Sequence, residues 1–443
     1  MNDQPALPPT TDSRAVRVTG GHRLEGTVTV QGSKNIALHL YAATLLADEP
    51  LTLTGAPEIL DTLVCAEILN HTGTPTKVVG DRFETAPAAA WYPVIPDQLG
   101  RRIRTTAVMA AALLTRAGQV SFPLPGGDAF CHRLIDRHLA AMEAAGATVA
   151  VTGTKVKARI ASWDQAAFTT DVLTHSWGPS LGATVTAMLL AARLRGTSTI
   201  LNPSVEPEVL VTAAVLAASG VGITWEGTTW EGTTALHVTG TDRITGGAFQ
   251  VPPDRLEAAT LALAAAITGG TVQLDNFPTT EFPDGLVAVF ADAGIELVPV
   301  NGGTLARCPA GPRAVQMATG PHPAFPTDVQ PQLTAFLTQA PGTSRIEERV
   351  YRERATHIGP LRALGAAVNA DGATITVRGA SPLAAADVAG EDIRAATAAL
   401  IAALAAEGTS TIRGMYHLRR GYDSLLPKLA SLGARLTIDQ EMP

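Results

Sequence analysis

The stretch Leu139–Val149, L-A-A-M-E-A-A-G-A-T-V, joins a short Ala-rich helical pattern, a glycine and the start of a β-type run. Similar stretches recur with their glycines at Gly73, Gly146, Gly220, Gly294, Gly365 and Gly433. A glycine after a helix can take the left-handed conformation that ends the helix before the chain enters a strand. Six such stretches at intervals of about 70 residues predict an internally repeated α/β protein.

A second series of Ala- and Leu-rich helical stretches is interleaved with the first. Its glycines are Gly118, Gly196, Gly270, Gly342 and Gly408, and Pro50 stands in the first copy. Each repeat would then hold two helices and several strands. The 443 residues exceed one ordinary core, so the length favours two lobes of three repeats over a single ring.

Composition excludes several classes of protein. The chain is 46% hydrophobic and 16% charged with a net charge of -7 and no basic run, so neither nucleic acid nor a membrane surface is an expected partner. Three scattered cysteines and no C-x-x-C pair argue against disulfides and structural zinc, and no nucleotide-binding glycine motif is present. No segment is apolar enough to span a bilayer. We expect a cytoplasmic protein with no metal and no cofactor; a monomer is compatible with the sequence, which leaves the oligomeric state open.

The stretch Phe122–His138, F-P-L-P-G-G-D-A-F-C-H-R-L-I-D-R-H, holds a dense set of titratable groups. Its prolines and glycines predict a loop. Loops that carry acids and cations over a rigid scaffold often form functional sites. The alternative is a solvated turn followed by a charged helix start.

Other candidate residues lie where loops enter helices. Lys34 opens a helix after Q-G-S, where a cation is unfavourable unless an anion shares the position; an exposed lysine is the alternative. R-R-I-R-T-T (101–106) raises the same question. Asp254 in V-P-P-D-R-L-E either caps a helix or marks a hinge between lobes. Asp328 ends the proline-rich loop P-H-P-A-F-P-T-D, as either a fixed catalytic base or a helix cap.

Arginines gather at loops and helix starts in the C-terminal half, in Y-R-E-R (351–354), D-I-R (392–394) and L-R-R-G-Y (418–422). Arginine grips carboxylates and phosphates with two parallel hydrogen bonds. Together they suggest a small polyanionic substrate, although each alone could form a surface ion pair.

S-K-N after the first strand, P-G-G-D-A-F-C-H-R, V-P-P-D-R, H-P-A-F-P-T-D, D-I-R and Y-H-L-R-R-G-Y together resemble the enolpyruvyltransferase family, above all its branch acting on UDP-N-acetylglucosamine. The resemblance runs from about residue 16 to the C-terminus. It implies a two-lobed inside-out α/β barrel of six β-α-β-α-β-β repeats, three per lobe. After a flexible tail (1–15), one lobe would comprise 34–252 and carry the catalytic loop, and the other 16–33 plus 253–443.

The resemblance also implies a reaction and the residues that perform it. A substrate hydroxyl adds to C2 of phosphoenolpyruvate, C3 is protonated, and the tetrahedral ketal then eliminates phosphate. The phosphate would be held by Lys34, Arg133 and Arg420, and the carboxylate by Arg354 and Arg394. Asp328 would be the base, Asp392 a supporting acid, and Asp128 the proton donor. The acceptor would contact Asn35, Arg104, Asp136, Ser180, Gly182, Asp328 and Val350. Glu206, Asp254 and Arg255 also fall at family positions.

Three departures from the family pattern lie on the loop and the acceptor side. Asp128 replaces the usual loop cysteine, so a thiol-directed epoxide would lose its target. Cys131 and Leu134 replace a glycine and a proline in the segment that lines the uridine pocket of relatives, and Gly178 replaces a lysine that meets a diphosphate. We therefore expect a uridine nucleotide acceptor, with the 3′-hydroxyl of UMP in nucleoside-antibiotic synthesis favoured. The alternatives are UDP-N-acetylglucosamine in cell-wall synthesis and a binding protein that has lost catalysis.

Overall fold

The computed structural model describes residues 14–128, 130, 134–162, 167–174, 178–227, 234–422 and 424–439. These residues divide into two compact α/β units. Unit 1 holds the described residues of 32–127 and 134–252, and unit 2 those of 14–31, 128, 130 and 253–439. Each unit has a hydrophobic core of its own. The predicted flexible tail lies almost wholly outside the described residues.

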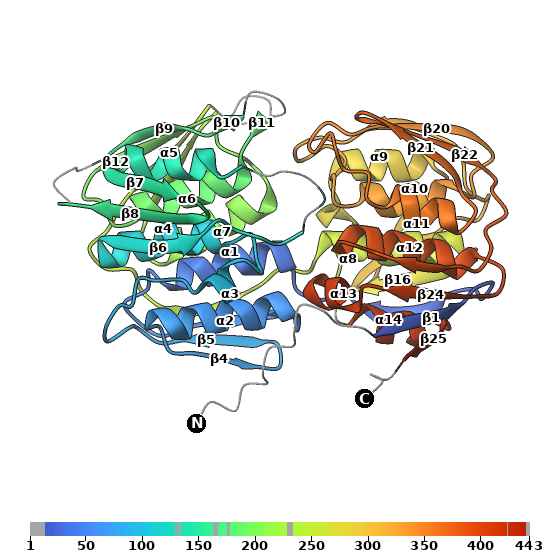
Figure 1. The fold of residues 1–443 in the computed structure, drawn as a ribbon, viewed down its shortest axis with the longest axis horizontal. Coiled ribbons are helices and arrows are strands. Elements are labelled where there is room, and N and C mark those ends of the chain that lie inside the picture. Colours follow the sequence, from blue (N-terminus) through green and yellow to red (C-terminus); the bar gives the residue numbers. More distant parts are fainter. Residues whose placement is uncertain are drawn as a thin grey trace. The chain divides into compact units, whose positions relative to one another are not determined.

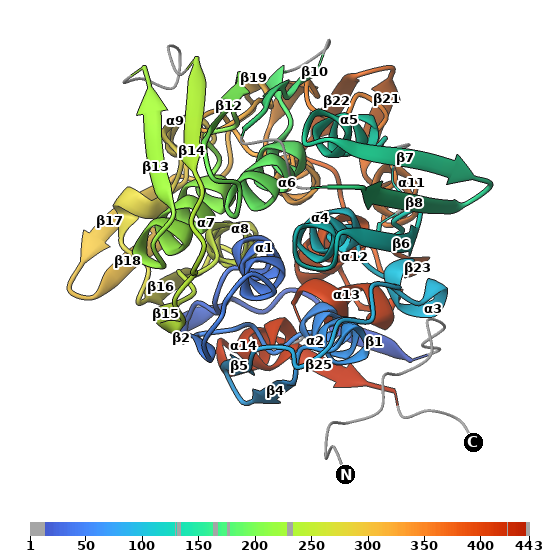
Figure 2. The same cartoon turned by 90° about the vertical axis from the view of Figure 1, so that its left-hand side faces the viewer.

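Unit 1 is built from three sheets and a short ribbon around helices (Figures 1 and 2). The first sheet has the order β15 (Gly247–Gln250), β3 (Leu51–Thr54), β5 (Arg82–Thr85), β4 (Thr76–Val79). The second is β6 (Gln119–Pro123), β8 (Lys155–Ile160), β7 (Ala147–Thr152). The third is β13 (Gly222–Glu226), β14 (Ala235–Thr239), β12 (Thr197–Leu201), β9 (Thr169–Asp171), and the ribbon is β10 (Leu173–Thr174) with β11 (Gly178–Pro179). The helices are α1 (Lys34–Thr44), α2 (Leu60–Thr72), α3 (Asp97–Gly100), α4 (Thr106–Ala117), α5 (Asp136–Ala144), α6 (Leu181–Ala191) and α7 (Pro207–Ala218).

Unit 2 also contains three sheets. Their orders are β17 (Glu296–Val300), β18 (Gly303–Arg307), β16 (Thr271–Asp275), β2 (Glu25–Thr29); then β19 (Gln316–Ala318), β20 (Gly342–Glu347), β22 (Thr374–Gly379), β21 (Ala367–Asp371); and β23 (Asp387–Ala389), β24 (Thr409–Arg413), β1 (Ala15–Thr19), β25 (Arg435–Ile438). The helices are α8 (Arg255–Ile267), η1 (Thr279–Glu281), α9 (Asp284–Asp292), α10 (Gln330–Leu337), α11 (Ile358–Ala363), α12 (Ile393–Ala405), α13 (Met415–Gly421) and α14 (Leu425–Ser431).

Ala-rich helices form the centre of each unit. In unit 1, α4 contacts both α1 and α6, and in unit 2, α8, α10 and α12 contact one another. Every residue of α8 is buried, as is expected of a helix that is apolar on all sides. Small alanine side chains let neighbouring helices approach closely. Strand β8 has one buried face, as its alternating burial shows.

The sheets share one pairing pattern. Each four-stranded sheet described has one parallel pair at one edge, and its other pairs are antiparallel. In unit 1, for example, β12 pairs in parallel with β9 and antiparallel with β14.

The predicted role of the first glycine series is confirmed, since all six of its glycines have φ between 90° and 107°. In the second series Gly118 ends its helix as predicted, and the prediction is wrong at the other four glycines, whose helices end earlier. Helix α8 ends at Ile267 and the left-handed residue is Gly269 rather than Gly270. Helix α6 ends at Ala191, and Gly196 lies beyond its end without a positive φ. Helices of the described part of the chain lack the length and apolar character needed to cross a membrane.

Candidate active site

Lys34 is held at the start of α1 by its local sequence. A Cβ on Gly32 would lie 1.7 Å from the carbonyl oxygen of Gly55, so only glycine fits there. Ser33 then caps α1 by accepting a hydrogen bond from the amide of Ile36. The Nζ of Lys34 lies 2.9 Å from the Oδ2 of Asp61, and the two side chains are only 9% and 3% exposed. The alternative of an exposed lysine is therefore wrong.

The predicted acceptor residues of unit 1 lie at helix starts and on the loop before α5. Asn35 follows Lys34 in α1, and Ser180 caps α6 by accepting from the amide of Ala183 at 3.3 Å. The Nη2 of Arg104 donates to the carbonyl of Leu134 at 2.6 Å. Asp136 opens α5 with a side chain that is 61% exposed. Arg133 lies outside the described residues.

His138 packs directly against Gly182. A Cβ on Gly182 would lie 2.7 Å from the Cε1 of His138, so the glycine is required by the imidazole. The Nδ1 of His138 forms a 2.7 Å hydrogen bond with the Oγ1 of Thr186. Burial, assisted by the charge of Arg104, lowers the pKa of His138 to about 3. The ring is therefore neutral at neutral pH and packs as a structural support of the α6 start.

In unit 2, Asp328 is shared by two buried arginines. Its Oδ1 lies 2.8 Å from an Nη2 of Arg354 and its Oδ2 lies 2.8 Å from an Nη2 of Arg394. The arginine side chains are 3% and 6% exposed and that of Asp328 is 24% exposed. Burial alone would raise the pKa of Asp328, but Arg394 and Arg354 outweigh burial and hold this pKa well below its usual range. The helix-cap alternative is wrong, because α10 begins at Gln330 without a side-chain cap.

The two arginines are fixed by further contacts. Arg354 donates from Nη1 to the Oγ1 of Thr327 at 2.8 Å, and the ring of Phe130 lies 4.0 Å from its guanidinium carbon. Arg394 donates to the hydroxyl of Tyr422. The buried Nε of Arg354 has no hydrogen-bond partner in the described part of the chain.

Glu348 connects the loop of Arg354 to the loop of Asp328. Its Oε1 accepts from the amides of Val350 and Tyr351 at 2.9 and 3.0 Å and from the Oγ1 of Thr319 at 2.8 Å. Its Oε2 accepts from the Oγ1 of Thr327 at 3.0 Å, the hydroxyl that receives the hydrogen bond of Arg354. Glu348 is 1% exposed. This buried carboxylate therefore fixes the backbone at Val350, a predicted acceptor contact.

Asp392 and Asp254 both cap helices. The Oδ1 of Asp392 accepts from the amides of Arg394 and Ala395 at 2.8 and 2.9 Å, and its Oδ2 accepts from Thr356 at 2.5 Å. Asp254 caps α8 in the same way, which confirms the capping interpretation. Asp392 thus fixes the start of the helix that carries Arg394.

Asp128 belongs to unit 2 and lies against α13. The Nη1 of Arg420 donates to the Oδ1 of Asp128 at 2.6 Å, and the two side chains are 5% and 13% exposed. The Nδ1 of His417 is 4.0 Å from the same oxygen. Phe130, two residues further along, forms an edge-to-face contact with Tyr351. Asp128, Asp328 and the three arginines Arg354, Arg394 and Arg420 are thus connected within one unit.

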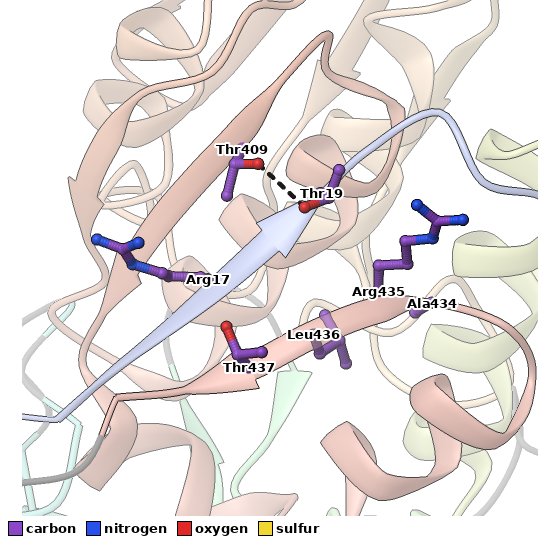
Figure 3. Close-up of a pocket in the computed structure, with 7 residues that line it drawn as sticks. All are labelled: Arg17, Thr19, Thr409, Ala434, Arg435, Leu436 and Thr437. Atoms are coloured by element: carbon purple, nitrogen blue, oxygen red, sulfur yellow. Dashed lines mark hydrogen bonds between the residues drawn. The ribbon is translucent and has the colours of Figure 1, made fainter.

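A pocket of about 410 Å³ lies elsewhere on unit 2, on strands β1, β24 and β25 (Figure 3). Arg17 and Arg435 line it, and the hydroxyls of Thr19 and Thr409 form a 3.0 Å hydrogen bond across it. None of the predicted site residues lines this pocket, and we assign no chemistry to it.

Each of the two α/β units thus holds buried cations that contact carboxylates. The chain belongs to the EPSP synthase (3-phosphoshikimate 1-carboxyvinyltransferase) family, whose sequence pattern matches residues 18–429. The protein is accordingly an enolpyruvyltransferase, as its sequence predicts.

Among its relatives, "UDP-N-acetylglucosamine 1-carboxyvinyltransferase 3" of Symbiobacterium thermophilum is 37% identical over 96% of this chain and 98% of its own. The UDP-N-acetylglucosamine 1-carboxyvinyltransferase of Novosphingobium aromaticivorans is also 37% identical, over 95% and 97%. The fold is similar to that of the enolpyruvyl transferase NikO from Streptomyces tendae (TM-score 0.86, 24% identity, 96% of this chain and 99% of that one). EPSP synthase from Acinetobacter baumannii has a TM-score of 0.73 at 17% identity, covering 97% of this chain and 100% of that one.

Sequence reasoning missed the residues that position the predicted ones. Asp61 and Glu348 were not singled out, and Thr327, Phe130 and Tyr422 appeared only as letters within motifs. Asp61 carried one signal, since it is an acid inside the otherwise apolar stretch L-D-T-L-V-C. No local sequence signal distinguishes Glu348 from its exposed neighbour Glu347. The two differ in burial because only one side of the end of β20 faces the core.

Proposed function

We propose that this enolpyruvyltransferase transfers the enolpyruvyl group of phosphoenolpyruvate to a hydroxyl of a uridine nucleotide and releases phosphate. The observation that carries the proposal is the pair of buried arginines, Arg354 and Arg394, that share a single carboxylate. Two buried guanidinium groups that contact the same carboxylate form a cationic site that can bind an anion. Planar forks of this kind match the carboxylate of phosphoenolpyruvate.

The proposed roles of the site residues follow from their charges. Lys34, Arg420 and Arg133 would bind the phosphate, and Arg354 and Arg394 the carboxylate. Asp328 would take the proton of the acceptor hydroxyl as this adds to C2, and Asp128 would deliver a proton to C3. Loss of that proton from C3 and departure of phosphate would then complete the enolpyruvyl ether. Asp392 would act by fixing the helix start that presents Arg394, since its oxygens are engaged by amides and a hydroxyl.

For the acceptor we favour the 3′-hydroxyl of UMP, as in nucleoside-antibiotic synthesis. Gly178 stands where relatives have a lysine that contacts a diphosphate. An acceptor with one phosphate needs fewer cationic side chains to bind it. Arg104, Ser180 and the α6 start supported by His138 would contact the nucleotide. UDP-N-acetylglucosamine is the second candidate, because it appears in the names of relatives that are 37% identical.

The proposal includes an architecture. Each of the described sheets would belong to one β-α-β-α-β-β repeat, with three repeats in each lobe of an inside-out barrel. The chain would cross between the lobes near Gly32 and Pro252, with 16–33 plus 253–443 in one lobe and 34–252 in the other. The reaction would take place in the cytoplasm and without a cofactor.

The test is phosphate release from phosphoenolpyruvate with UMP and with UDP-N-acetylglucosamine offered separately. Arg354→Gln should abolish phosphate release, because it removes a buried guanidinium group that would bind the carboxylate of phosphoenolpyruvate. Arg349→Gln is the matched control, since Arg349 is five residues away, 47% exposed and paired only with Glu347 among the contacts of the described residues. Release with UMP alone supports the favoured acceptor, and release with the sugar nucleotide alone supports the second. The proposal is contradicted if no phosphate is released with either nucleotide, or if Arg354→Gln is as active as Arg349→Gln.

A further inference from the structure

The arginines assigned to the two anionic groups of phosphoenolpyruvate already hold carboxylates of this chain. Arg354 and Arg394 each contact one oxygen of Asp328, both at 2.8 Å. Arg420 contacts Asp128 at 2.6 Å. These same two carboxylates are the ones assigned as the base and the proton donor. Substrate-binding and proton-transferring groups therefore neutralise each other in the ligand-free protein.

The contacts of Asp328 imitate a bound ligand. One carboxylate bridges two guanidinium groups with one oxygen on each, which is the geometry in which arginine pairs recognise a free carboxylate. Buried cations at 3%, 6% and 5% exposure require counter-charge, and without substrate the chain must supply it.

The carboxylates are the more exposed members of these pairs. Arg354 is held by Thr327 and by the ring of Phe130. Asp128 and Asp328 are more exposed than their partners, at 13% and 24%, so an incoming anion can reach them.

In this arrangement neither acid can do its proposed work. The two arginines keep the pKa of Asp328 well below its usual range against the opposing effect of burial, which makes it a poor proton acceptor. A hydrogen bond from Arg420 likewise stabilises Asp128 as the carboxylate, which has no proton to donate. Each acid must leave its arginine before the reaction can proceed.

We propose that the carboxylate of phosphoenolpyruvate displaces Asp328 from Arg354 and Arg394, and its phosphate displaces Asp128 from Arg420. The displaced Asp328 then accepts the proton of the acceptor hydroxyl, and the displaced Asp128 takes up a proton from water before it donates one to C3. This displacement rests on the proposed function. It adds that, in the free protein, the catalytic carboxylates occupy the arginines that bind the anionic groups of the substrate. Binding of the correct dianionic substrate is thereby coupled to activation of both proton-transfer groups.

The test is a crossed binding experiment with Asp328→Asn and Asp128→Asn. Calorimetry measures the dissociation constants of acetate, inorganic phosphate and phosphoenolpyruvate for each variant and the wild type. If the aspartate is released from its arginines in 10% or less of the wild-type molecules, removing its charge should lower the dissociation constant of the anion by about tenfold or more. Asp328→Asn should gain affinity for acetate and not for phosphate, and Asp128→Asn the reverse. Both should bind phosphoenolpyruvate more tightly while losing turnover.

Asp254→Asn is the matched control. It removes a negative charge that acts on Arg394, and asparagine caps a helix about as well as aspartate. It should gain affinity for neither probe. Equal gains for every anion in all three variants would show a general charge effect and overturn the proposal, as would the absence of any gain.

Two further readouts keep the outcomes distinct. If Asp328→Asn does not fold, Asp328→Ala is purified with acetate or with phosphate; recovery by acetate alone supports displacement, and recovery by neither overturns it. The binding pattern needs no turnover. If the proposed function fails and the displacement is correct, the wild type forms no product, while Asp328→Asn still gains affinity for acetate and Asp128→Asn still gains affinity for phosphate.

Discussion

Glu348 offers a sharp test of how the site is held together, because its exposed neighbour serves as the control. Glu348 accepts four hydrogen bonds, from two amides and two hydroxyls, and is 1% exposed. Glu347, beside it, is 46% exposed and pairs with Arg349 on the surface. Both are substituted by glutamine, which preserves size and changes only the charge and one acceptor.

The expected loss follows from the contacts. In Glu348→Gln the amide oxygen can keep the hydrogen bonds at Oε1 in weaker form. The new NH₂ group would face Thr327 Oγ1, which already accepts from Arg354. One hydrogen bond to a charged group is lost, which costs about 2 kcal/mol of unfolding free energy. Glu348→Ala also leaves the amides of Val350 and Tyr351 without their acceptor and should cost about 3–5 kcal/mol.

The assay is urea unfolding of wild type and variants, followed by initial rates against phosphoenolpyruvate concentration. Glu348→Gln should lower the urea midpoint and raise KM for phosphoenolpyruvate more than it lowers kcat, because Arg354 loses its fixed position. Glu347→Gln should change neither quantity measurably, since exposed ion pairs contribute little. If the two glutamine variants behave alike, the positioning role of Glu348 is refuted.

Other outcomes follow from unit 1 and the loop. Asp61→Asn should cost about 3–5 kcal/mol in urea unfolding, because it removes the carboxylate that pairs with the buried Lys34 ammonium. Gly182→Ala should cost about 1–3 kcal/mol through its clash with His138, and His138→Ala in the same chain should recover part of that loss. His138, with a pKa of about 3 when folded, takes up a proton on unfolding, so stability should fall as pH drops from about 6.5 towards 3; His138→Ala should flatten the slope by up to about 1.4 kcal/mol per pH unit in acid unfolding curves. A thiol-directed epoxide should leave no adduct on Asp128 by mass spectrometry, whereas Asp128→Cys should acquire one.

The family and the α/β class could be predicted from the sequence because they rest on local signals. Glycines that end helices need only the left-handed conformation that the six predicted ones adopt. At Gly270, one of the positions where the prediction was wrong, two adjacent glycines competed for the same cap and local sequence could not separate Gly269 from Gly270.

The candidate site was predictable at its charged residues and not at their supports. Arg354 and Arg394 stand out as arginines at loop and helix-start positions. Their sharing of Asp328 depends on bringing residues 66 positions apart in sequence to 2.8 Å, which no local pattern encodes. Asp61 is similar, since its pairing with Lys34 requires α2 to pack on α1.

The central claim is tested most directly by proton NMR of a mixture of phosphoenolpyruvate, UMP and the protein. The account predicts the vinyl protons of an enolpyruvyl ether on UMP, with one phosphate released per ether formed. The same ether on UDP-N-acetylglucosamine alone would preserve the chemistry and replace the acceptor. No ether with either nucleotide, while phosphoenolpyruvate binds to the wild type, would contradict the account.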